Sequence, residues 1–205
     1  MAWPEHLDLE SWQPWRPEEL AARLAGVDVP WWVCAGWAVD LHLGEQTREH
    51  EDLEFGVNRP DFPVIRDVLL PGHELYSIGG PDDANRLGPN DVPGPEYTQV
   101  WTYDPAAKAF RTDTFVDPGN RDEWVSKRDP RVRLPLSDAI AVTATGIPYQ
   151  RPEVVLFMKA KHRRAKDEAD LAHVWPTLTP ARRDWFSDAL ALVHPGHPWL
   201  AGPPR

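Results

Sequence analysis

The chain has 205 residues, of which 41% are hydrophobic and 26% charged, and this composition excludes a disordered or fibrous protein. The formal net charge of −10 argues against binding to duplex nucleic acid, because that binding depends on Lys and Arg neutralising phosphates. No apolar run approaches the roughly 20 residues of a membrane span, and the first residues lack a secretory signal pattern, so no membrane partner is expected. The single cysteine, Cys34, suits the cytoplasm as the expected compartment.

The first part of the chain predicts alternating helices and strands. A helix over 16–27 is expected to begin near Pro17 and to end at Gly26, where glycine favours helix termination. A short apolar strand over 30–36 ends in a tight turn, and a second helix runs from this turn to Gly44. Further strands are expected at 52–57 and 73–78, with a helix at 59–72 between them.

Residues 79–95 contain four Gly and four Pro, and this content predicts a long loop without regular structure over most of its length. The alternating runs at 97–105 and 109–119 predict an antiparallel hairpin, and 122–150 predicts short strands around turns. Residues 151–178 and 179–194 predict three helices. The order favours an α+β fold, with a core over 1–150 and a helical region over 151–205 packed on it.

A group of acidic residues follows the second predicted helix, in the stretch "QTREHEDLEFGV" from Gln46 to Val57. On a strand, His50, Asp52 and Glu54 would share one face, with Asp52 and Glu54 about 7 Å apart. Asp113, in the second strand of the hairpin, would add a third carboxylate if the strands are neighbours. Carboxylates that converge repel each other without a cation, and Mg²⁺ prefers such oxygens together with substrate phosphates. Two such ions can clamp the attacking and leaving oxygens of a phosphoryl transfer.

The turn at Ala35 and Gly36 is a candidate phosphate site. Free backbone N–H groups at a helix N-terminus bind anions, and Gly36 allows the chain to approach a bulky anion closely. The basic run from Lys159 to Lys166 has two interpretations: it is a solvated helix face, or Lys159 and Lys161 bind a triphosphate.

The stretch "CAGWAVDLHLGEQTREHEDLEFGV" resembles the nucleotidyltransferase superfamily that includes DNA polymerase beta. It is most similar to the aminoglycoside and lincosamide nucleotidyltransferases, which show a Gly-Gly-Trp turn, a helical Asp, Thr-Arg, a His and an Asp-x-Asp/Glu strand. Residues that match this pattern are Ala35, Gly36, Trp37, Asp40, Thr47, Arg48, His50, Asp52 and Glu54. The chain departs from it at Ala35, where the family has its first Gly, and at Glu54, where Asp is commoner.

The resemblance implies a small twisted mixed sheet with flanking helices, and transfer of a nucleoside monophosphate from an NTP to a hydroxyl with release of pyrophosphate. Asp52, Glu54 and Asp113 would bind two Mg²⁺ ions, and Asp113 would share a metal or take the proton of the acceptor hydroxyl. Ala35 and Gly36, with Trp37, would bind the nucleotide phosphates, ATP among the candidate donors. The acceptor would be a small antibiotic-like molecule. Neither the acceptor, the base of the NTP nor the oligomeric state follows from the sequence.

The remaining residues of the motif have structural interpretations. Asp40 and Arg48 are expected to form an ion pair that fixes the loop between them, and His50 to orient the carboxylates through a hydrogen bond. Trp37, Trp101 and Tyr103 either stack on a base or sugar or belong to the core.

Two other functions fit parts of the same sequence. One is a nucleotidyltransferase-like domain that has lost turnover and acts as a sensor or as half of a toxin–antitoxin pair. The other is an Fe(II) oxygenase that binds iron through His50, Asp52 and a distant His162 or His173. The predicted helices argue against the oxygenase, which would need a mainly β barrel around the iron.

Overall fold

The computed structural model describes residues 3–4, 7–80 and 83–202. Helices within this part are α1 (Pro17–Arg23), α2 (Ala35–Leu43), α3 (Phe62–Leu69), α4 (Leu136–Ala139), α5 (Pro152–Lys159), α6 (Ala165–Val174) and α7 (Pro180–Val193), with short 3₁₀ helices η1 (Arg59–Asp61), η2 (Trp175–Thr177) and η3 (Pro198–Ala201).

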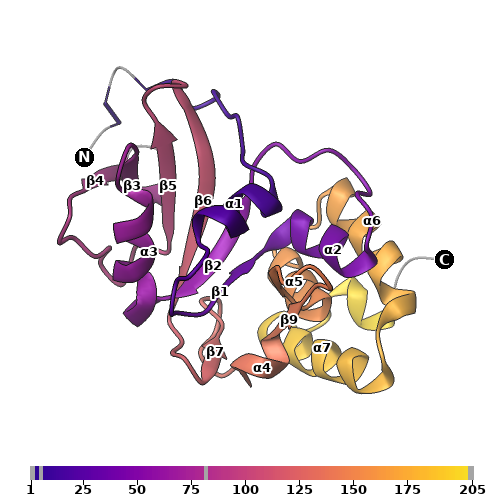
Figure 1. Ribbon diagram of the computed structural model, residues 1–205. Helices are drawn as coiled ribbons and strands as arrows, with labels where there is room; N and C mark the ends of the chain where they lie inside the picture. The colour runs from indigo at the N-terminus through magenta and orange to yellow at the C-terminus, as the bar shows by residue number, and fades with distance from the viewer. Residues whose placement is uncertain (1–2, 5–6, 81–82, 203–205) are drawn as a thin grey trace.

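The strands are β1 (Trp31–Val33), β2 (Glu54–Asn58), β3 (Glu74–Gly80), β4 (Asp83–Leu87), β5 (Gln99–Asp104), β6 (Ala109–Asp117), β7 (Glu123–Val125), β8 (Arg133–Pro135), β9 (Ile140–Val142) and β10 (Pro148–Gln150). Eight of them form one mixed sheet in the order β4-β3-β5-β6-β2-β1-β10-β9, and β7 pairs with β8 separately. Within the large sheet β2 runs parallel to β6 and β1 parallel to β10, whereas the other pairs are antiparallel. Figure 1 shows α5, α6 and α7 grouped at the β1–β9 end of this sheet.

The helix boundaries follow from local sequence. Pro17 occupies the first turn of α1, where its missing N–H is no loss, and Pro152 and Pro180 do the same in α5 and α7. Gly44 ends α2 in the left-handed conformation, with φ of 79°, and its N–H donates to the carbonyl of Asp40. These boundaries confirm the predicted helix starts near Pro17, Pro152 and Pro180 and the end of α2 at Gly44, but α1 ends at Arg23 rather than at Gly26.

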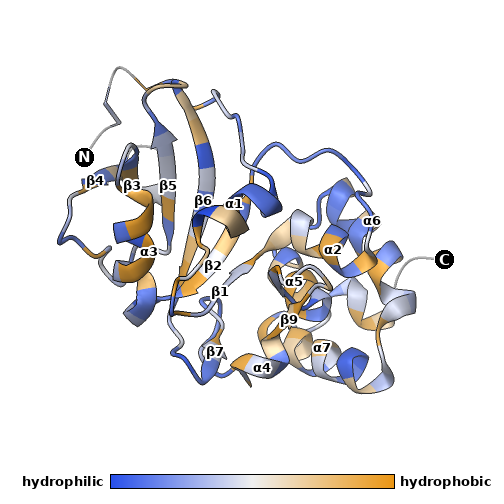
Figure 2. Cartoon of the chain, in the orientation of Figure 1, coloured by the Kyte–Doolittle hydropathy of each residue, from blue (hydrophilic) through white to orange (hydrophobic). Residues whose placement is uncertain are grey.

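The two largest hydrophobic cores lie on the two faces of the sheet. Alternate residues of β1 divide between them: Val33 faces the core formed with α1 and α3, and Trp32 faces the core formed with α2, α5, α6 and α7. Figure 2 shows hydrophobic residues along α3 and α5, whereas the loop between α2 and β2 is largely hydrophilic. Glu54 and Gly56 share the face of Trp32, since Gly56 is the register partner of Trp32, and this face carries the acidic residues.

The α+β class and the hairpin of β5 with β6 are confirmed, but two predictions about strands are wrong. The second strand begins at Glu54, so Asp52 and His50 lie before it rather than on it. The segment 79–95 contains regular structure that the prediction missed, because β3 extends to Gly80 and β4 pairs with it along Asp83–Leu87, whereas 88–95 are irregular as expected; residues 81 and 82 lie outside the described part. Its Gly and Pro residues cluster around the strand rather than within it.

The division of the chain at residue 150 stays a prediction. β10, in the first part, lies in the sheet beside β1, and α5, in the second part, packs against α2 in one continuous core. Among the described helices, none has the length and apolar character needed to cross a membrane.

Gly56→Ala tests the close packing of β2 against β1. A Cβ at this position would lie 2.3 Å from the Trp32 Nε1 atom, inside the core, so the substitution should destabilise the protein by about 1–3 kcal/mol. Urea unfolding measures this change. Gly80→Ala is the matched control, because a Cβ there would meet no described heavy atom within 4 Å, and its unfolding free energy should stay within about 0.5 kcal/mol of the wild type. Equal effects of the two substitutions would contradict the packing.

Candidate active site

Two carboxylates lie side by side on the central strands. Glu54, the first residue of β2, is the register partner of Asp113 on the parallel strand β6. Asp113 is 5% exposed, and its Oδ2 atom accepts a hydrogen bond of 2.6 Å from Gln99 Nε2, whereas its buried Oδ1 atom has no partner among the described residues. Asp52 lies in the bend before β2 and is partly buried. The topology therefore brings together the three acidic residues that the sequence singled out.

The environment of these carboxylates opposes their ionisation. Burial raises the pKa of Glu54 to about 8, and the nearby carboxylates of Asp52 and Asp113 add to the effect. Burial likewise raises the pKa of Asp113 to about 7, although the charge of Lys127 and the hydrogen bond from Gln99 act in the opposite direction. Groups with such pKa values hold protons near neutral pH unless a cation replaces them.

The donor set fits a divalent cation in its chemistry. Carboxylate oxygens are the ligands of Mg²⁺, and both the unpartnered Oδ1 of Asp113 and the raised pKa values of the pair indicate missing positive charge. Within the described residues, however, no three His, Cys, Asp or Glu side chains are arranged to hold a metal ion. The carboxylates are thus close enough to affect each other's pKa but do not form a finished set of ligands.

A cavity of about 520 Å³ opens beside Glu54, between the sheet and the C-terminal helices. Its lining residues are Ala35, Glu54, Thr98, Gln99, Phe115, Asp117, Lys127, Arg128, Gln150, Val155, Met158, Lys159, Lys161, His162 and Arg164. The acidic lining comes from β2 and β6, whereas the basic lining comes from the loop after β7 and from the segment that joins α5 to α6. Such a division suits a ligand that carries both metal ions and phosphates.

The basic run 159–166 is not one helix face, because it spans the turn between α5 and α6. Lys159 is buried, and its Nζ atom pairs with Asp170 at 2.9 Å and with Asp167 at 3.2 Å. Lys161 is exposed and forms no ion pair with the described residues. Arg164 pairs with Asp167 and also lowers the pKa of Glu54. The basic residues of the turn between α5 and α6 that line the cavity form its basic wall. In this wall Lys161 has no ion-pair partner among the described residues, whereas Lys159 is already neutralised by two carboxylates.

The turn before α2 differs from the expected phosphate cradle. Ala35 lines the cavity and has a φ of 52°, in the left-handed region that favours glycine, so this position explains why a first Gly is usual there. Gly36 does not line the cavity. A Cβ on it would lie 2.4 Å from Arg48 Nη2 and 2.6 Å from His50 Cε1, so its missing side chain admits these two side chains instead.

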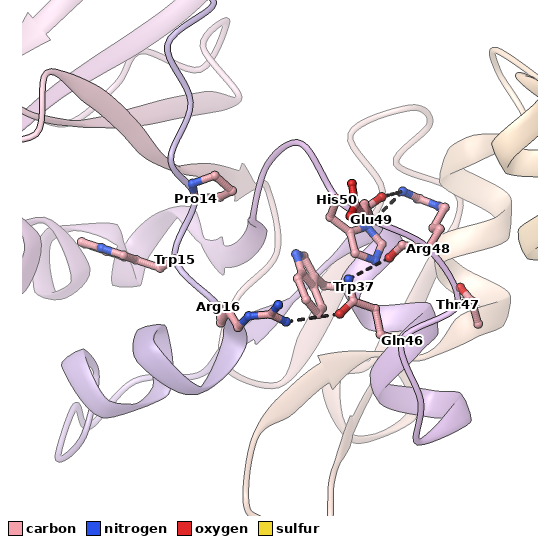
Figure 3. A pocket seen from close by; sticks show the side chains of 9 residues that line it. All are labelled: Pro14, Trp15, Arg16, Trp37, Gln46, Thr47, Arg48, Glu49 and His50. Carbon is pink, nitrogen blue, oxygen red and sulfur yellow. Dashed lines mark hydrogen bonds between the residues drawn. The ribbon is translucent and has the colours of Figure 1, made fainter.

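Trp37 also lies away from the cavity of Glu54 and lines a second cavity of about 500 Å³ (Figure 3). Its ring lies 4.4 Å from the His50 ring, and the guanidinium of Arg16 lies 5.4 Å from its centroid. Arg16 Nη1 in turn donates to Gln46 Oε1. Helix α2 thus contributes Ala35 to one cavity and Trp37 to the other.

The residues Asp40, Thr47, Arg48 and His50 form a network that holds the loop before β2. Asp40 Oδ1 accepts from the backbone N and the Oγ1 of Thr47, and its Oδ2 lies 2.5 Å from His50 Nε2. His50 Nδ1 lies 3.0 Å from Arg48 Nη1, which can only donate, so these partners assign the neutral tautomer with its proton on Nε2. Burial lowers the pKa of His50, in agreement with a neutral ring.

Two predicted pairings in this network are wrong. Arg48 pairs with Asp170 of α6, at 3.7 Å, rather than with Asp40. The hydrogen bond of His50 goes to Asp40 rather than to Asp52 or Glu54, so His50 fixes the loop and not the carboxylates directly. The oxygenase interpretation would need a nitrogen of His50 to bind iron, but Nε2 is hydrogen-bonded to Asp40 and Nδ1 to Arg48. In the described part, no three His, Cys, Asp or Glu side chains are placed to hold a metal ion. Trp101 and Tyr103 lie in an aromatic cluster with Trp12 and Phe110.

Several residues of the cavity were not singled out from the sequence. Gln99, Asp117, Lys127 and Arg128 reach it because β5, β6 and the loop after β7 converge there. Gln99 and Asp117 mark strand ends, and a search for polar residues at the ends of the hairpin strands would have found them. Lys127 and Arg128 follow a short strand, and only the tertiary packing of that loop shows their role.

Comparison with known proteins identifies the class of fold. The sequence model of the family described as aminoglycoside-2''-adenylyltransferase matches residues 18–71, a segment that contains the motif from Ala35 to Glu54. A crystal structure of ANT(2'')-Ia in complex with adenylyl-2''-tobramycin superposes with a TM-score of 0.56 at 9% identity, over 85% of this chain and 95% of that one. A solution structure of the antibiotic-resistance factor ANT(2'')-Ia gives a TM-score of 0.55 at 11% identity, over 85% and 89%. No curated protein matches the sequence.

The chain therefore shares the fold of these ANT(2'')-Ia structures, and the predicted α+β architecture is confirmed. The particular likeness is to the aminoglycoside nucleotidyltransferases, and the resemblance inferred from the motif is confirmed by the family match over the same residues.

Glu54→Gln tests the cost of burying this carboxylate. Its pKa is higher in the folded chain than the usual 4.5, so the folded state binds more protons than the unfolded state between about pH 4.5 and 8. Stability therefore falls as pH rises through this window. Glutamine removes the charge, and we expect the metal-free variant to be more stable at pH 8.5, on the order of 2 kcal/mol or roughly 4–8 °C in Tm, with little difference at pH 4.5.

Glu51→Gln is the matched control for this experiment, since its side chain is 91% exposed and lies three residues away. Thermal unfolding in EDTA should show no pH-dependent gain for this variant. A Glu54→Gln protein as stable as the wild type at every pH would contradict the buried charge.

Ala35→Gly tests the strained turn. A left-handed Ala costs about 1–2 kcal/mol, whereas Gly loses about 0.5–1 kcal/mol more conformational entropy on folding, so the exchange should be neutral or stabilising by up to about 1 kcal/mol. Urea unfolding measures the difference. Ala38→Gly, within the same helix at an ordinary φ, should destabilise by about 1 kcal/mol or more, and a similar loss for Ala35→Gly would rule out the strain.

Proposed function

We propose that this protein is a nucleotidyltransferase that transfers a nucleoside monophosphate from an NTP to a hydroxyl of a small molecule. One observation carries the proposal: the partly buried Glu54, whose register partner is the buried Asp113, lines a cavity whose lining also carries basic residues. The fold and the family match over residues 18–71 support the same class of reaction. We keep the cytoplasm as the expected compartment.

Each acidic residue has a role in this proposal. Asp52 and Glu54 would hold Mg²⁺, with Asp113 as a shared ligand, and these ions when bound would neutralise the phosphates and activate the acceptor oxygen. Where Asp113 does not ligate a metal ion, it takes the proton of the acceptor hydroxyl, because burial raises its pKa to about 7, which suits a general base near neutral pH. Gln99 orients this carboxylate through the bond to Oδ2, which leaves Oδ1 for the metal ion or the proton.

The basic residues of the cavity and the turn at the start of α2 bind the phosphates. Lys161 offers an unpaired ammonium group, and Ala35 brings the backbone at the start of α2 to the cavity. Lys159 acts less directly, because its charge is shared with Asp167 and Asp170, but it still lowers the pKa of Glu54 and so favours the ionised form that a metal requires. The structure offers Gly36 and Trp37 no such place, and we assign them to the packing around His50.

The acceptor is proposed from the comparisons. The ligand named with one matched structure is an adenylylated tobramycin, so aminoglycosides are the first acceptors to test and ATP the first donor. The acidic net charge of −10 favours the approach of a cationic acceptor by long-range attraction.

The second candidate is a binding module without turnover, and two observations favour it. The three carboxylates do not form a finished set of metal ligands among the described residues, and Ala35 strains the turn where the related enzymes have Gly. Such a protein would bind Mg²⁺ and NTP but release no pyrophosphate.

Pyrophosphate release measured with each of the four NTPs, Mg²⁺ and a panel of aminoglycosides and lincosamides tests the proposal. Wild-type protein should release pyrophosphate only with an acceptor present, and Asp113→Asn should lower kcat by about 10²–10⁴, because the general base is lost. EDTA should abolish the signal.

Asp188→Asn serves as control, since Asp188 is an exposed residue of α7, and it should keep wild-type activity. Calorimetry separates the two candidates: NTP binding without pyrophosphate release supports the binding module, and activity that survives Asp113→Asn rules out the site proposed above.

A further inference from the structure

A lysine in the loop after β7 occupies an unusual position at the cavity. Lys127 follows Val125 and Ser126, and its Nζ atom lies 3.8 Å from the centroid of the Phe115 ring. Phe115 stands on β6 midway between Asp113 and Asp117, and residues two apart on a strand share a face. The ammonium group therefore lies over the strand between two buried carboxylates.

The charge of Lys127 reaches both of these groups without forming an ion pair. Burial raises the pKa of Asp113, of Asp117 and of the Cys34 thiol, and the charge of Lys127 opposes this rise in all three. Yet Lys127 makes no ion pair with any described residue, and Asp117 instead accepts from Trp124 Nε1 at 3.0 Å. A partly buried ammonium group that only contacts a ring gains about 0.5–1 kcal/mol, less than a carboxylate or phosphate partner would provide.

The loop that carries Lys127 is fixed across the cavity. Arg128 Nη2 donates to the carbonyl of Met158, near the end of α5, and Ser126 Oγ accepts from the backbone N of Arg128. Because Met158 precedes Lys159 and the loop to Lys161, this contact ties the hairpin of β7 and β8 to the basic wall. Lys127 is held there by the fold, not by a flexible surface loop.

We propose that Lys127 binds the phosphate chain of the donor nucleotide, and that Arg128 is its positioning residue. The inference rests on the proposed function and adds to it a cation from the loop after β7, whereas Lys161 belongs to the turn between α5 and α6. Both cations line the cavity with Glu54, and both lack an ion-pair partner among the described residues.

Lys127 then has a defined part in the reaction. The acceptor oxygen forms a bond to the α-phosphorus, and the bond from that phosphorus to the bridging oxygen of the β-phosphate breaks. The electron pair stays on the bridging oxygen, which leaves as pyrophosphate, and the hydroxyl proton moves to Asp113. Lys127 stabilises the negative charge that develops on the leaving group.

Lys127→Met tests this role, because Met keeps the contact with Phe115 and removes only the charge. Isothermal calorimetry with inorganic tripolyphosphate and Mg²⁺ gives a readout that depends neither on the base nor on turnover. We expect binding roughly tenfold weaker or more for Lys127→Met, and within about threefold of wild type for Lys127→Arg. Lys166→Met is the control, since Lys166 pairs with Glu51 and does not line the cavity.

Arg128→Met tests the positioning role. It leaves the charge of Lys127 in place but frees the loop, so tripolyphosphate binding should weaken less than in Lys127→Met, and in an active enzyme kcat should fall more than KM rises. The inference is overturned if Lys127→Met binds tripolyphosphate as tightly as the wild type. It is also overturned if Lys127→Arg loses as much binding as Lys127→Met and has a lowered Tm, because the loss would then come from damage to the fold. If Lys127→Met binds normally while wild type still releases pyrophosphate, only this inference fails; if wild type neither binds tripolyphosphate nor releases pyrophosphate, the proposed function fails with it.

Discussion

The parallel pairing of β2 with β6 is the constraint on which the site depends. It sets Glu54 directly opposite Asp113, so two like charges must be held together in a poorly solvated place. Only a rigid surrounding can do this, and the two cores on either side of the sheet provide it, with Phe55 and Val57 of β2 buried in one and Trp32 of the adjacent strand buried in the other. The pair costs stability unless a cation joins it, which is the usual conflict between a functional site and the fold that carries it.

The distribution of positive charge follows from this constraint. Basic residues approach the acidic pair from two separate parts of the chain, the loop after β7 and the turn between α5 and α6, and neither places an ammonium group in an ion pair with Glu54 or Asp113 among the described residues. Lys159 is instead neutralised by carboxylates of α6, and Lys127 rests on an aromatic ring. If a lysine paired directly with Glu54 or Asp113, its ammonium group would occupy the place of a metal ion. Because the basic and acidic side chains stay apart, the carboxylates remain available to metal ions and the cations to phosphates.

The sequence predicted those features that depend on local chemistry. Helix ends at Gly44 and at Pro152 follow from backbone rules that act within a few residues, and the motif from Ala35 to Glu54 led to the correct fold. The start of β2 was predicted too early, because alternation of charged residues alone does not distinguish a strand from the bend before it. β4 was missed because Gly and Pro on both sides hid the short run from Asp83 to Leu87.

The features that escaped prediction depend on contacts between distant segments. No local pattern pairs Arg48 with Asp170, or brings Lys127 over Phe115, because both contacts exist only once the hairpin and the C-terminal helices have packed on the sheet. Gly36 illustrates the same limit. The sequence correctly predicted that another group approaches the backbone at Gly36, but the predicted group was a phosphate. The groups that approach it are the side chains of Arg48 and His50, which the loop after α2 brings back over the helix.

The two departures from the family pattern are neighbours on the lining of one cavity, because the backbone N–H of Cys34, the residue before Ala35, donates to the carbonyl of Glu54 at 2.8 Å. Ala35 adds a methyl group to the turn at the start of α2, and Glu54 adds a methylene to its side chain, so both add volume to the same part of the lining. For the proposed reaction, this added volume leaves less room for a metal ion and a phosphate beside the start of α2. The cation that the loop after β7 contributes to the same cavity, Lys127, would then matter more for binding the phosphate chain.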